Sequence, residues 1–449
     1  MRAAIARRAL LLLALTAGSG CAAASTHRYR TLQDDWQRSA VDRPSADAGE
    51  DPFAGVAELS RAVLVNQVLE RNPNVRAARY AWRAALARYP QATALDDPML
   101  GGTLAPRSLG TSRVDEAYSV ELSQAFPFPG KLALRGQAAL GEAEAAARDF
   151  AAVRLRLALM ASLLYDDYYV AARSVALNAE HIELLESFQQ IAVARYEAGE
   201  AAQQDPIQAE VELSHALHDR ILLGTESRIA AEQINALLHR ASDAGLPPPP
   251  TGVARPERTP ELAADLVAQA LAERPELAAA QARVAAEQAR ADLARREYWP
   301  DFTLSGGYDR FWEESELRPS VGLAVNVPLQ LRRRDAAVDE AEARLEQARS
   351  ERAALEDEVR LAVESGAHRY VEAHHVLHLI ADRQLPASRD QVEAARSGFE
   401  TGRNSFLALI DAERNLRNVE LEYEQALANV SRRRAELDRA LGRVAGVAW

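Results

Sequence analysis

Two acidic side chains stand out in this chain because each lies shortly after a glycine in a repeated stretch. The first stretch, EAGEAAQQDPIQAEVEL, contains Gly199 and Asp205. The second, ETGRNSFLALIDAERNL, contains Gly402 and Asp411. The stretches align at a constant offset of 402 − 199 = 203 positions. Because glycine allows tight chain reversal, the repeat predicts two equivalent turns, each followed by a carboxylate.

Four histidines crowd one segment with a helical pattern, namely His368, His374, His375 and His378. His374 and His378 are four residues apart and would share a helix face. No carboxylate-and-histidine motif of a catalytic metal site accompanies them. Only three Met occur in the chain, which gives no support to a methionine-lined path for copper. We therefore expect surface or interhelical histidines, with no metal site and no cofactor.

Composition favours long helices. Hydrophobic residues make up 48% of the 449 positions but aromatic residues only 6%, so the apolar content is mostly Ala, Leu and Val, which suits helices. The formal net charge is −12, whereas nucleic-acid binding needs clustered Lys and Arg. No nucleic-acid partner is expected. We find no glycine-rich phosphate loop and no nucleophile beside a base, so the chain is not expected to be an enzyme.

Residues 1–20 have the pattern of an export signal, in which three arginines precede an apolar run and small residues precede Cys21. The apolar run is too short to span a bilayer. Cys21 is the only cysteine, which excludes an intramolecular disulfide. The segment resembles a bacterial lipoprotein signal, although Gly18 stands where Leu is usual. We expect residues 21–59 to be a lipidated N-terminal segment; the alternative is an ordinary secretory signal cleaved near Ala22–Ala24.

The repeat extends beyond the two turns. Glu70–Pro90 corresponds to Glu273–Pro300: each has Pro in the first turn of a helix, where its missing N–H costs nothing, and each ends at an aromatic–Pro pair. We expect a first structural repeat over residues 60–250 and a second over 251–449, joined by a proline-rich linker. A period of about 200 residues is too long for a solenoid unit, so the pattern indicates a duplicated half-domain.

Each repeat has a strand pair, expected at residues 99–126 and 301–328. Apolar residues alternate with small or polar ones in Tyr118–Ser123 and Ser320–Val327, which is typical of a sheet with one apolar face. Ala117–Phe126 has the length of a tilted membrane strand, and aromatic residues lie at the strand ends, as in the girdles of outer-membrane barrels. An ordinary soluble sheet with one wet face fits the same pattern.

Four strands cannot close a membrane barrel, since the smallest such barrels have about eight. An open edge in lipid would leave backbone N–H and C=O groups unpaired. If these strands lie in a membrane, the chain must oligomerise, and a trimer would supply twelve strands.

A very long helix is expected after each strand pair. The first, at residues 131–196, has 66 residues without proline, a length of roughly 100 Å at about 1.5 Å per residue. The second, at residues 335–400, is similar, but Pro386 is expected to kink it. The two turns then form hairpin tips at residues 197–206 and 400–411.

This order of elements, repeated twice, resembles the TolC-type outer-membrane efflux channels. The tip motifs YEAGxxxxxD and FETGxxxFLxLIDAE are the most specific part, and SQAFPFPGKLALR and LDDPMLGG look closest to the branch that serves heavy-metal and cation exporters. The resemblance covers nearly the whole chain after Cys21. It implies a mainly α fold with a small transmembrane β part: a homotrimeric α-barrel tunnel in the periplasm and a shared twelve-stranded β-barrel in the outer membrane, with a lipid anchor.

The resemblance also implies partners and a function. A periplasmic adaptor protein and an inner-membrane pump of the RND type would join the channel in a tripartite efflux system, in which the channel is a passive conduit. The main alternative is a periplasmic lipoprotein adaptor or a coiled-coil structural protein of an export complex. An adaptor usually has one helical hairpin, whereas this sequence indicates two equivalent hairpins beside two strand pairs.

Site residues carried over from the family lie at the tips. Gly199 and Gly402 would dock the adaptor. Asp411 matches a position that faces the pore at its narrowest point, so a trimer would form a ring of three carboxylates. Asp205 matches a position that ties neighbouring helices when the gate is closed, and Arg403 is a candidate tie across the tip.

Each of these roles has a plainer alternative. Asp205 followed by Pro206 also fits the N-cap and first residue of the returning helix. Asp411 also fits a solvated helix face. The family often has a second acidic ring, but Ala408 holds the matching position here, which leaves the charge of the gate open.

A basic run, Arg332, Arg333 and Arg334, follows the second strand pair near a helix start. Positive charge there opposes the helix dipole, so lipid phosphates or a pairing acid would have to compensate it. Lys131 and Arg135 hold a similar place in the first repeat. A solvated basic patch is the alternative.

Overall fold

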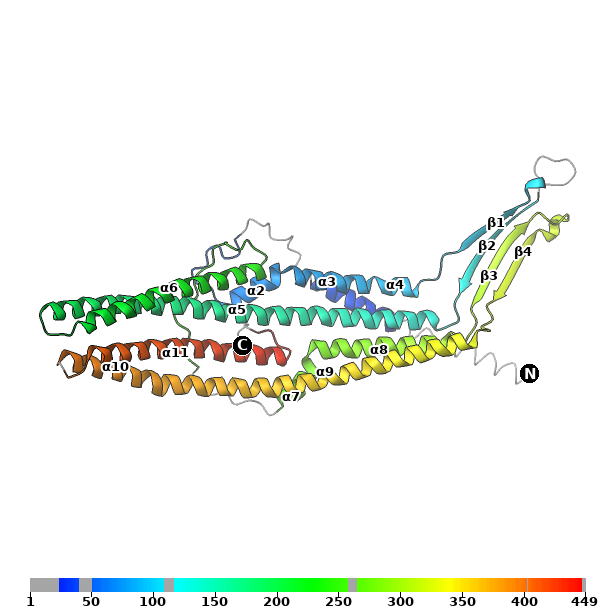
Figure 1. The fold of residues 1–449 in the computed structure, drawn as a ribbon. Coiled ribbons are helices and arrows are strands. Elements are labelled where there is room, and N and C mark those ends of the chain that lie inside the picture. The colour runs from blue at the N-terminus through cyan, green and yellow to red at the C-terminus, as the bar shows by residue number, and fades with distance from the viewer. Residues whose placement is uncertain (1–23, 40–50, 109–116, 257–264, 402, 446–449) are drawn as a thin grey trace. The chain divides into compact units, whose positions relative to one another are not determined.

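The computed structural model describes residues 24–39, 51–108, 117–256, 265–401 and 403–445. The export signal, Cys21 and Gly402 lie outside these described residues. The chain divides into two compact units (Figure 1). Unit 1 includes Ala78–Phe150 and Glu276–Leu355, and unit 2 includes Val41–Ala77, Ala151–Pro275 and Glu356–Trp449.

Unit 1 contains the sheet and the helices that lead into and out of it. Its helical parts are residues 24–38, most of α3 (Pro73–Leu86), α4 (Arg88–Thr93), α8 (Pro275–Arg296), and the first parts of α5 (Lys131–Glu197) and α9 (Leu331–Leu379). The strands are β1 (Met99–Leu104), β2 (Tyr118–Phe126), β3 (Phe302–Asp309) and β4 (Pro319–Val325).

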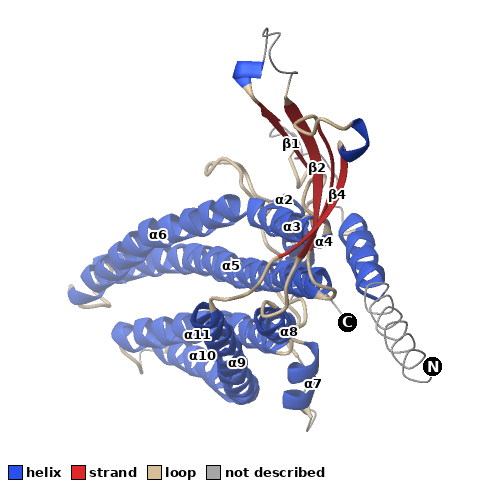
Figure 2. Cartoon of the chain, turned by 90° about the vertical axis from the view of Figure 1, so that its right-hand side faces the viewer, coloured by secondary structure: helices blue, strands red, loops and turns tan. Residues whose placement is uncertain are grey.

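The four strands form one antiparallel sheet in the order β1-β2-β3-β4 (Figure 2). Its register confirms the period of two expected from the sequence. Leu122 lies opposite Leu100 on one side and Gly306 on the other, and Leu304 lies opposite Leu323. One face therefore carries nearly all the large apolar side chains: Leu100, Leu104, Tyr118, Val120, Leu122, Phe126, Phe302, Leu304, Tyr308, Val321, Leu323 and Val325.

The apolar face of the sheet is exposed in the single chain. Val321 is 86% exposed and Leu100 is 74% exposed, although burial of such side chains is the usual source of sheet stability. The opposite face is built mainly from small and polar residues, among them Ser119, Ser123 and Ser305. The sheet therefore has the reverse of the usual soluble arrangement, in which the apolar face covers a core.

Unit 2 contains the two helical hairpins. Its elements are α2 (Arg61–Arg71), the rest of α5, α6 (Gln204–Leu237), α7 (Leu266–Glu273), the rest of α9, the π-helical turn η3 (Ile380–Gln384), α10 (Leu385–Glu400) and α11 (Phe406–Ala440). The first hairpin is α5 followed by α6, and the second is α10 followed by α11. Among the described residues, no helix combines the length and the apolar character needed to cross a membrane.

The long helices have the continuity expected from the sequence. Helix α5 has 67 residues. The interruption expected at Pro386 is confirmed, because the regular helix gives way to η3 just before it. Pro386 has no N–H to donate to the carbonyl of Asp382, four residues earlier, and the N–H of Leu385 donates instead to the carbonyl of Ile380, five residues back.

Small residues let helices α5 and α8 approach closely in unit 1. A Cβ atom added at Gly141 would lie 2.9 Å from the carbonyl oxygen of Ala282 and 2.9 Å from the Cβ atom of Ala286. Ala145, Ala279 and Ala282 form a buried cluster beside it. Only small residues such as glycine and alanine allow the backbones of α5 and α8 to lie this close. The contact packs together the helix that follows β2 and the helix that precedes β3.

Candidate functional site

The first hairpin tip is closed by a glycine in the left-handed region. Gly199 has φ = 75°, which a residue without a Cβ atom adopts at little cost. The N–H of Glu200 donates to the carbonyl of Arg195 at 2.8 Å, and the N–H of Gly199 donates to the carbonyl of Tyr196 at 2.9 Å. These two bonds form a Schellman motif, which satisfies the last carbonyl groups of helix α5.

The second tip has the same closing bond. The N–H of Arg403 donates to the carbonyl of Gly398 at 2.8 Å, and both residues lie 203 positions after Glu200 and Arg195 (403 − 200 and 398 − 195). The helix that follows begins differently, since Ser405 caps α11 by accepting the N–H of Ala408. The two turns inferred from the sequence repeat therefore share this closing hydrogen bond, whereas the starts of the helices that follow differ.

The tip residues singled out by sequence lie in unit 2. Asp205 lies in the first turn of α6, but Gln203 is the N-cap, so the assignment of Asp205 as N-cap was wrong by two positions. The side chain of Arg403 donates to Thr401 Oγ1 at 3.0 Å within its own turn. Asp411 is 55% exposed on α11, and its carboxylate is 3.3 Å from Nη1 of Arg414.

An apolar cluster, which we call the tip core, holds the two hairpins together within unit 2. Its buried members come from α5, α6, α10 and α11: Ile182, Leu185, Phe188, Ala192, Ala209, Ala216, Val392, Ala395, Phe406, Leu409, Ile410 and Ala412. The ring of Phe406 lies edge-on to Phe188, with ring centroids 6.4 Å apart, and 5.6 Å from the ring of Phe399. Aromatic pairs of this geometry add stability beyond their buried area.

Charged side chains of α11 reinforce the tip core, and sequence reasoning missed them. Arg414 forms an ion pair with Glu212 of α6 in addition to Asp411. Arg417 donates to Asp219 of α6 at 2.8 Å and to Asn178 of α5 at 3.0 Å. Arg414 and Arg417 thus link the second hairpin to the first. Acidic and basic residues are common on all these helices, so no sequence pattern singles out these pairs.

His181 lies on α5 beside these ion pairs. Burial and the positive charges of Arg417 and Arg414 together lower the pKa of His181 to about 4, against the opposing effect of Glu212 and Asp219. The imidazole is therefore neutral at pH 7. Protonation would place a third positive charge next to the two arginines that connect the hairpins.

A buried polar network extends along α5 and α11. Tyr169 donates from its hydroxyl to Glu424 at 2.6 Å, and Arg173 donates from Nε to the other carboxylate oxygen at 2.9 Å. Burial and the Glu424 carboxylate both raise the pKa of the Tyr169 phenol. Because buried charges need partners, this network fixes one alignment of the two helices.

The histidine segment lies at the π-helical turn. His374 is buried, with the rings of Tyr370 and His378 beside it, and burial lowers its pKa. His378 contacts Asp382 at 3.3 Å and Arg255. His374 is thus a buried histidine whose ring neighbours lie on its own helix, α9. Within the described part of the chain, no group of three or more His, Cys, Asp or Glu side chains is placed to hold a metal ion.

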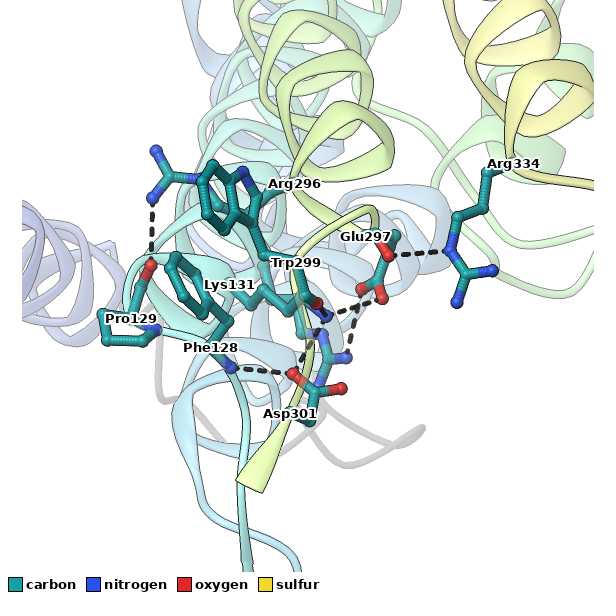
Figure 3. A network of polar contacts seen from close by, with 9 residues as sticks. Phe128, Pro129, Lys131, Arg296, Glu297, Trp299, Asp301 and Arg334 are labelled. Atoms are coloured by element: carbon teal, nitrogen blue, oxygen red, sulfur yellow. Dashed lines mark hydrogen bonds and ion pairs between the residues drawn. The ribbon is translucent and has the colours of Figure 1, made fainter. Parts of the chain in front are cut away.

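In unit 1, Lys131 forms the centre of a polar network where the sheet meets the helices (Figure 3). Its side chain is 1% exposed. Nζ donates to Glu297 Oε2 at 2.9 Å, to the carbonyl of Trp299 at 3.0 Å and to Asp301 Oδ1 at 2.9 Å. Lys131 begins α5, and the three acceptors lie on the segment between α8 and β3. The lysine therefore joins the segment that follows β2 to the segment that precedes β3.

Neighbouring contacts complete this junction. The backbone N–H of Phe128 donates to Asp301 Oδ1 at 2.7 Å, and the rings of Phe128 and Trp299 stack with centroids 5.0 Å apart. Burial would raise the pKa of Asp301, but the hydrogen bonds from Lys131 and Phe128 outweigh it and lower this pKa. Gly130 has φ = 96°, and a Cβ atom there would lie 2.8 Å from the Arg296 guanidinium, so only glycine fits this turn.

Comparison with known proteins agrees with this architecture. The model of the outer membrane efflux protein family matches residues 64–239 and again residues 266–443. The chain belongs to the outer membrane efflux protein family. These two matches together cover most of the chain and confirm the resemblance inferred from the tip motifs.

Individual members of the family extend this finding. The cobalt-zinc-cadmium resistance protein CzcC of Cupriavidus metallidurans is 24% identical over 340 residues, which cover 75% of this chain and 78% of CzcC. The outer membrane protein OprJ of Pseudomonas aeruginosa is 26% identical over 448 residues, 90% of this chain and 89% of OprJ. The solved structure of CusC has the same fold, with a TM-score of 0.70 and 18% identity over 90% of this chain and 99% of that one.

The junction predicts a stability effect for Lys131→Met in this family member. Removal of one partner of a buried ion pair typically costs about 3–5 kcal/mol. Glu297 and Asp301 are 40% and 34% exposed and regain water when the lysine is lost, so we expect the free energy of unfolding to fall by about 2–3 kcal/mol. Denaturant titration in detergent, followed by circular dichroism, measures this change.

Arg135→Met is the matched control. Its guanidinium lies 3.7 Å from Glu297 and is 39% exposed, so its loss should cost less than about 1 kcal/mol. If Lys131→Met and Arg135→Met lowered the free energy of unfolding equally, the buried ion pairs of Lys131 would contribute no more to stability than the exposed pair of Arg135.

His181 predicts a pH dependence of stability. Its folded pKa of about 4 lies below the unfolded value of 6.5, so between these values the unfolded chain binds the extra proton. Stability is therefore full above pH 6.5 and declines as the pH falls toward 4, by at most about 1.4 kcal/mol per pH unit. His181→Gln should lose less stability than the wild type between pH 7.5 and pH 5. The exposed His215 supplies a control, His215→Gln, and an unchanged slope in His181→Gln refutes the assignment.

Proposed function

We propose that this protein is the outer-membrane channel of a tripartite efflux system, through which substrates pass from the periplasm to the exterior. The observation that carries the proposal is the sheet of unit 1, whose exposed apolar face and small polar face suit lipid on one side and water on the other. Family membership favours the channel over the alternative of an adaptor or coiled-coil protein.

The working unit in this proposal is a homotrimer. Among the described strands, β1 and β4 each have a neighbour on one side only, and unpaired strand edges are not tolerated in lipid. Three copies of the four-stranded sheet would close a twelve-stranded β-barrel. The hairpins of the three copies would then form the periplasmic tunnel, and the apolar side chains exposed on α6, such as Ile221 at 68%, would be covered by neighbouring copies.

The gate in this proposal lies at the tips. Three Asp411 carboxylates would line the narrowest point, with Asp205 near the start of each α6. Because the Arg403 side chain is bonded within its own turn, we assign the closing ties to Arg414 and Arg417, which bind Glu212 and Asp219 of the first hairpin.

The partners in this proposal are a periplasmic adaptor and an inner-membrane pump of the RND type. The adaptor would dock against the two turns at Gly199 and Gly402 and separate the hairpins, since ties of this kind can hold two discrete arrangements. Heavy-metal cations are the proposed substrate class. One relative is a cobalt-zinc-cadmium resistance protein, and a ring of carboxylates suits the passage of cations.

Asp411→Asn tests the gate and the channel together. We expect unaltered folding and a three-chain species on cross-linking, because Asp411 is exposed. In planar bilayers, the variant should show about half the cation-over-anion selectivity of the wild type or less, and weaker block by multivalent cations, since rings of acidic side chains favour cations. Asp390→Asn, which removes the same charge from an exposed position of α10, should behave like the wild type.

Two results would contradict this proposal in different ways. If the wild type gives no conductance and remains a single chain on cross-linking, it is not a channel. If it conducts and Asp411→Asn matches it in conductance, selectivity and block, Asp411 lies on a solvated helix face and not in the gate.

A lipid anchor at Cys21 belongs to the same proposal. Thioether-linked diacylglycerol with an N-terminal acyl chain would hold the N-terminus at the membrane, since stable anchoring takes more than one chain. Cells that express the wild type should incorporate labelled palmitate into this protein, and Cys21→Ser should abolish the label. Absence of label in the wild type would instead indicate an ordinary cleaved secretory signal.

A further inference from the structure

An apolar stripe on strand β4 continues beyond the strand and ends in arginines. The odd-numbered residues of Pro319–Val325 lie on the apolar face of the sheet. The next odd-numbered residues, Val327, Leu329 and Leu331, are also exposed, Leu329 by 82%. The N–H of Leu329 donates to the carbonyl of Val327, and the N–H of Leu331 donates to that of Leu329. These short-range bonds keep the connection to α9 ordered although its side chains cover no core.

Two of the three arginines that follow have no partner among the described residues. Arg334 donates to the carbonyl oxygens of Glu297 and Gln330 at 2.9 and 3.4 Å. Arg332 and Arg333 are exposed, and neither forms a hydrogen bond or an ion pair with any other described residue. The first turn of α9 contains no acidic side chain, so their charge adds unfavourably to the positive end of the helix dipole.

The basic residues at the start of α5 meet the same problem with carboxylates from the segment between α8 and β3. Lys131 at the start of α5 is buried against Glu297 and Asp301, and Arg135 lies 3.7 Å from Glu297. The acid that follows them in sequence, Asp335, accepts from the Tyr298 hydroxyl, and no described acid pairs with Arg332 or Arg333. A negative charge that pairs with these two arginines would therefore come from outside the described chain.

We propose that the connection Val327–Arg333 is a docking surface for anionic phospholipid headgroups, in the leaflet that faces the helices. The inference rests on the proposed function, which places the sheet in the membrane. Val327, Leu329 and Leu331 would extend the apolar sheet face to the edge of the acyl chains, and Arg332 and Arg333 would bind lipid phosphates, which guanidinium groups bind through two parallel N–H donors.

The arrangement favours a lipid over other sources of negative charge. Cationic side chains directly beside exposed apolar ones match the order of layers in a bilayer surface, where phosphate lies next to hydrocarbon. A free phosphate ion would gain nothing from the three exposed apolar side chains. Trp299, on the neighbouring connection between α8 and β3, is 56% exposed, and tryptophan is enriched at this depth of a membrane.

The test compares Arg332→Gln/Arg333→Gln with the wild type in delipidated, detergent-solubilised full-length protein. Dioleoyl-phosphatidylglycerol or dioleoyl-phosphatidylcholine is titrated in, and bound lipids are counted by native mass spectrometry. We expect the wild type to prefer phosphatidylglycerol and the double variant to bind it roughly tenfold more weakly, because each basic residue near an anionic surface contributes severalfold to affinity. Arg332→Lys/Arg333→Lys should retain part of the preference.

The matched control is Arg220→Gln/Arg228→Gln on α6, which removes the same charge from exposed positions that form no hydrogen bond or ion pair with other described residues. This control should keep the wild-type preference. The inference is overturned if both double variants bind phosphatidylglycerol equally, if inorganic phosphate displaces the lipid, or if Arg332→Gln/Arg333→Gln changes the number of chains in the assembly, which would place the arginines against a second copy. Failure of the wild type to conduct in bilayers would instead overturn the proposed function. Normal conductance without lipid preference overturns this inference alone.

Discussion

Every backbone N–H and C=O group at a strand edge needs a partner, and this constraint governs what the sheet of unit 1 can do. Strands β1 and β4 are each paired on one side only among the described strands, and the apolar face is exposed. In water such a sheet invites aggregation, and in lipid its edges are prohibitive. Copies of the same sheet placed edge to edge meet both demands, since they pair the edges and leave the apolar face for lipid.

The Lys131 network holds the base of the sheet, where β2 ends and β3 begins. Glu297, Trp299 and Asp301 accept from one ammonium group, so the segments that end β2 and begin β3 cannot slide past each other without breaking several bonds. An apolar residue could fill the same volume but would not specify this alignment. The tip core and the ion pairs of Arg414 and Arg417 give the hairpins of unit 2 a comparable alignment.

Much of this fold could be predicted from sequence because its signals are periodic or repeated. Alternation in Tyr118–Ser123 identified β2, and the glycine turns identified both tips. Strand β1 has a weaker alternating pattern, because Gly101 and Gly102 interrupt it. The partners of Lys131, Arg414 and Arg417 could not be predicted, since they depend on how helices pack over long sequence separations. The N-cap of α6 was misplaced because Asp205 followed by Pro206 has the composition of a cap without its backbone geometry.

Equivalent residues of the duplicated tips differ in how deeply they are buried. Ala209 and Ala412 are equivalent in the repeat and both are buried in the tip core. Their neighbours diverge: Ile410 is 1% exposed, whereas its counterpart Ile207 is 53% exposed. Helix α11 therefore buries its apolar side chain within the chain, and α6 keeps the equivalent one on its surface. Duplication preserved the turn, while divergence left α6 with exposed apolar side chains, the kind of surface that marks contact with another protein chain.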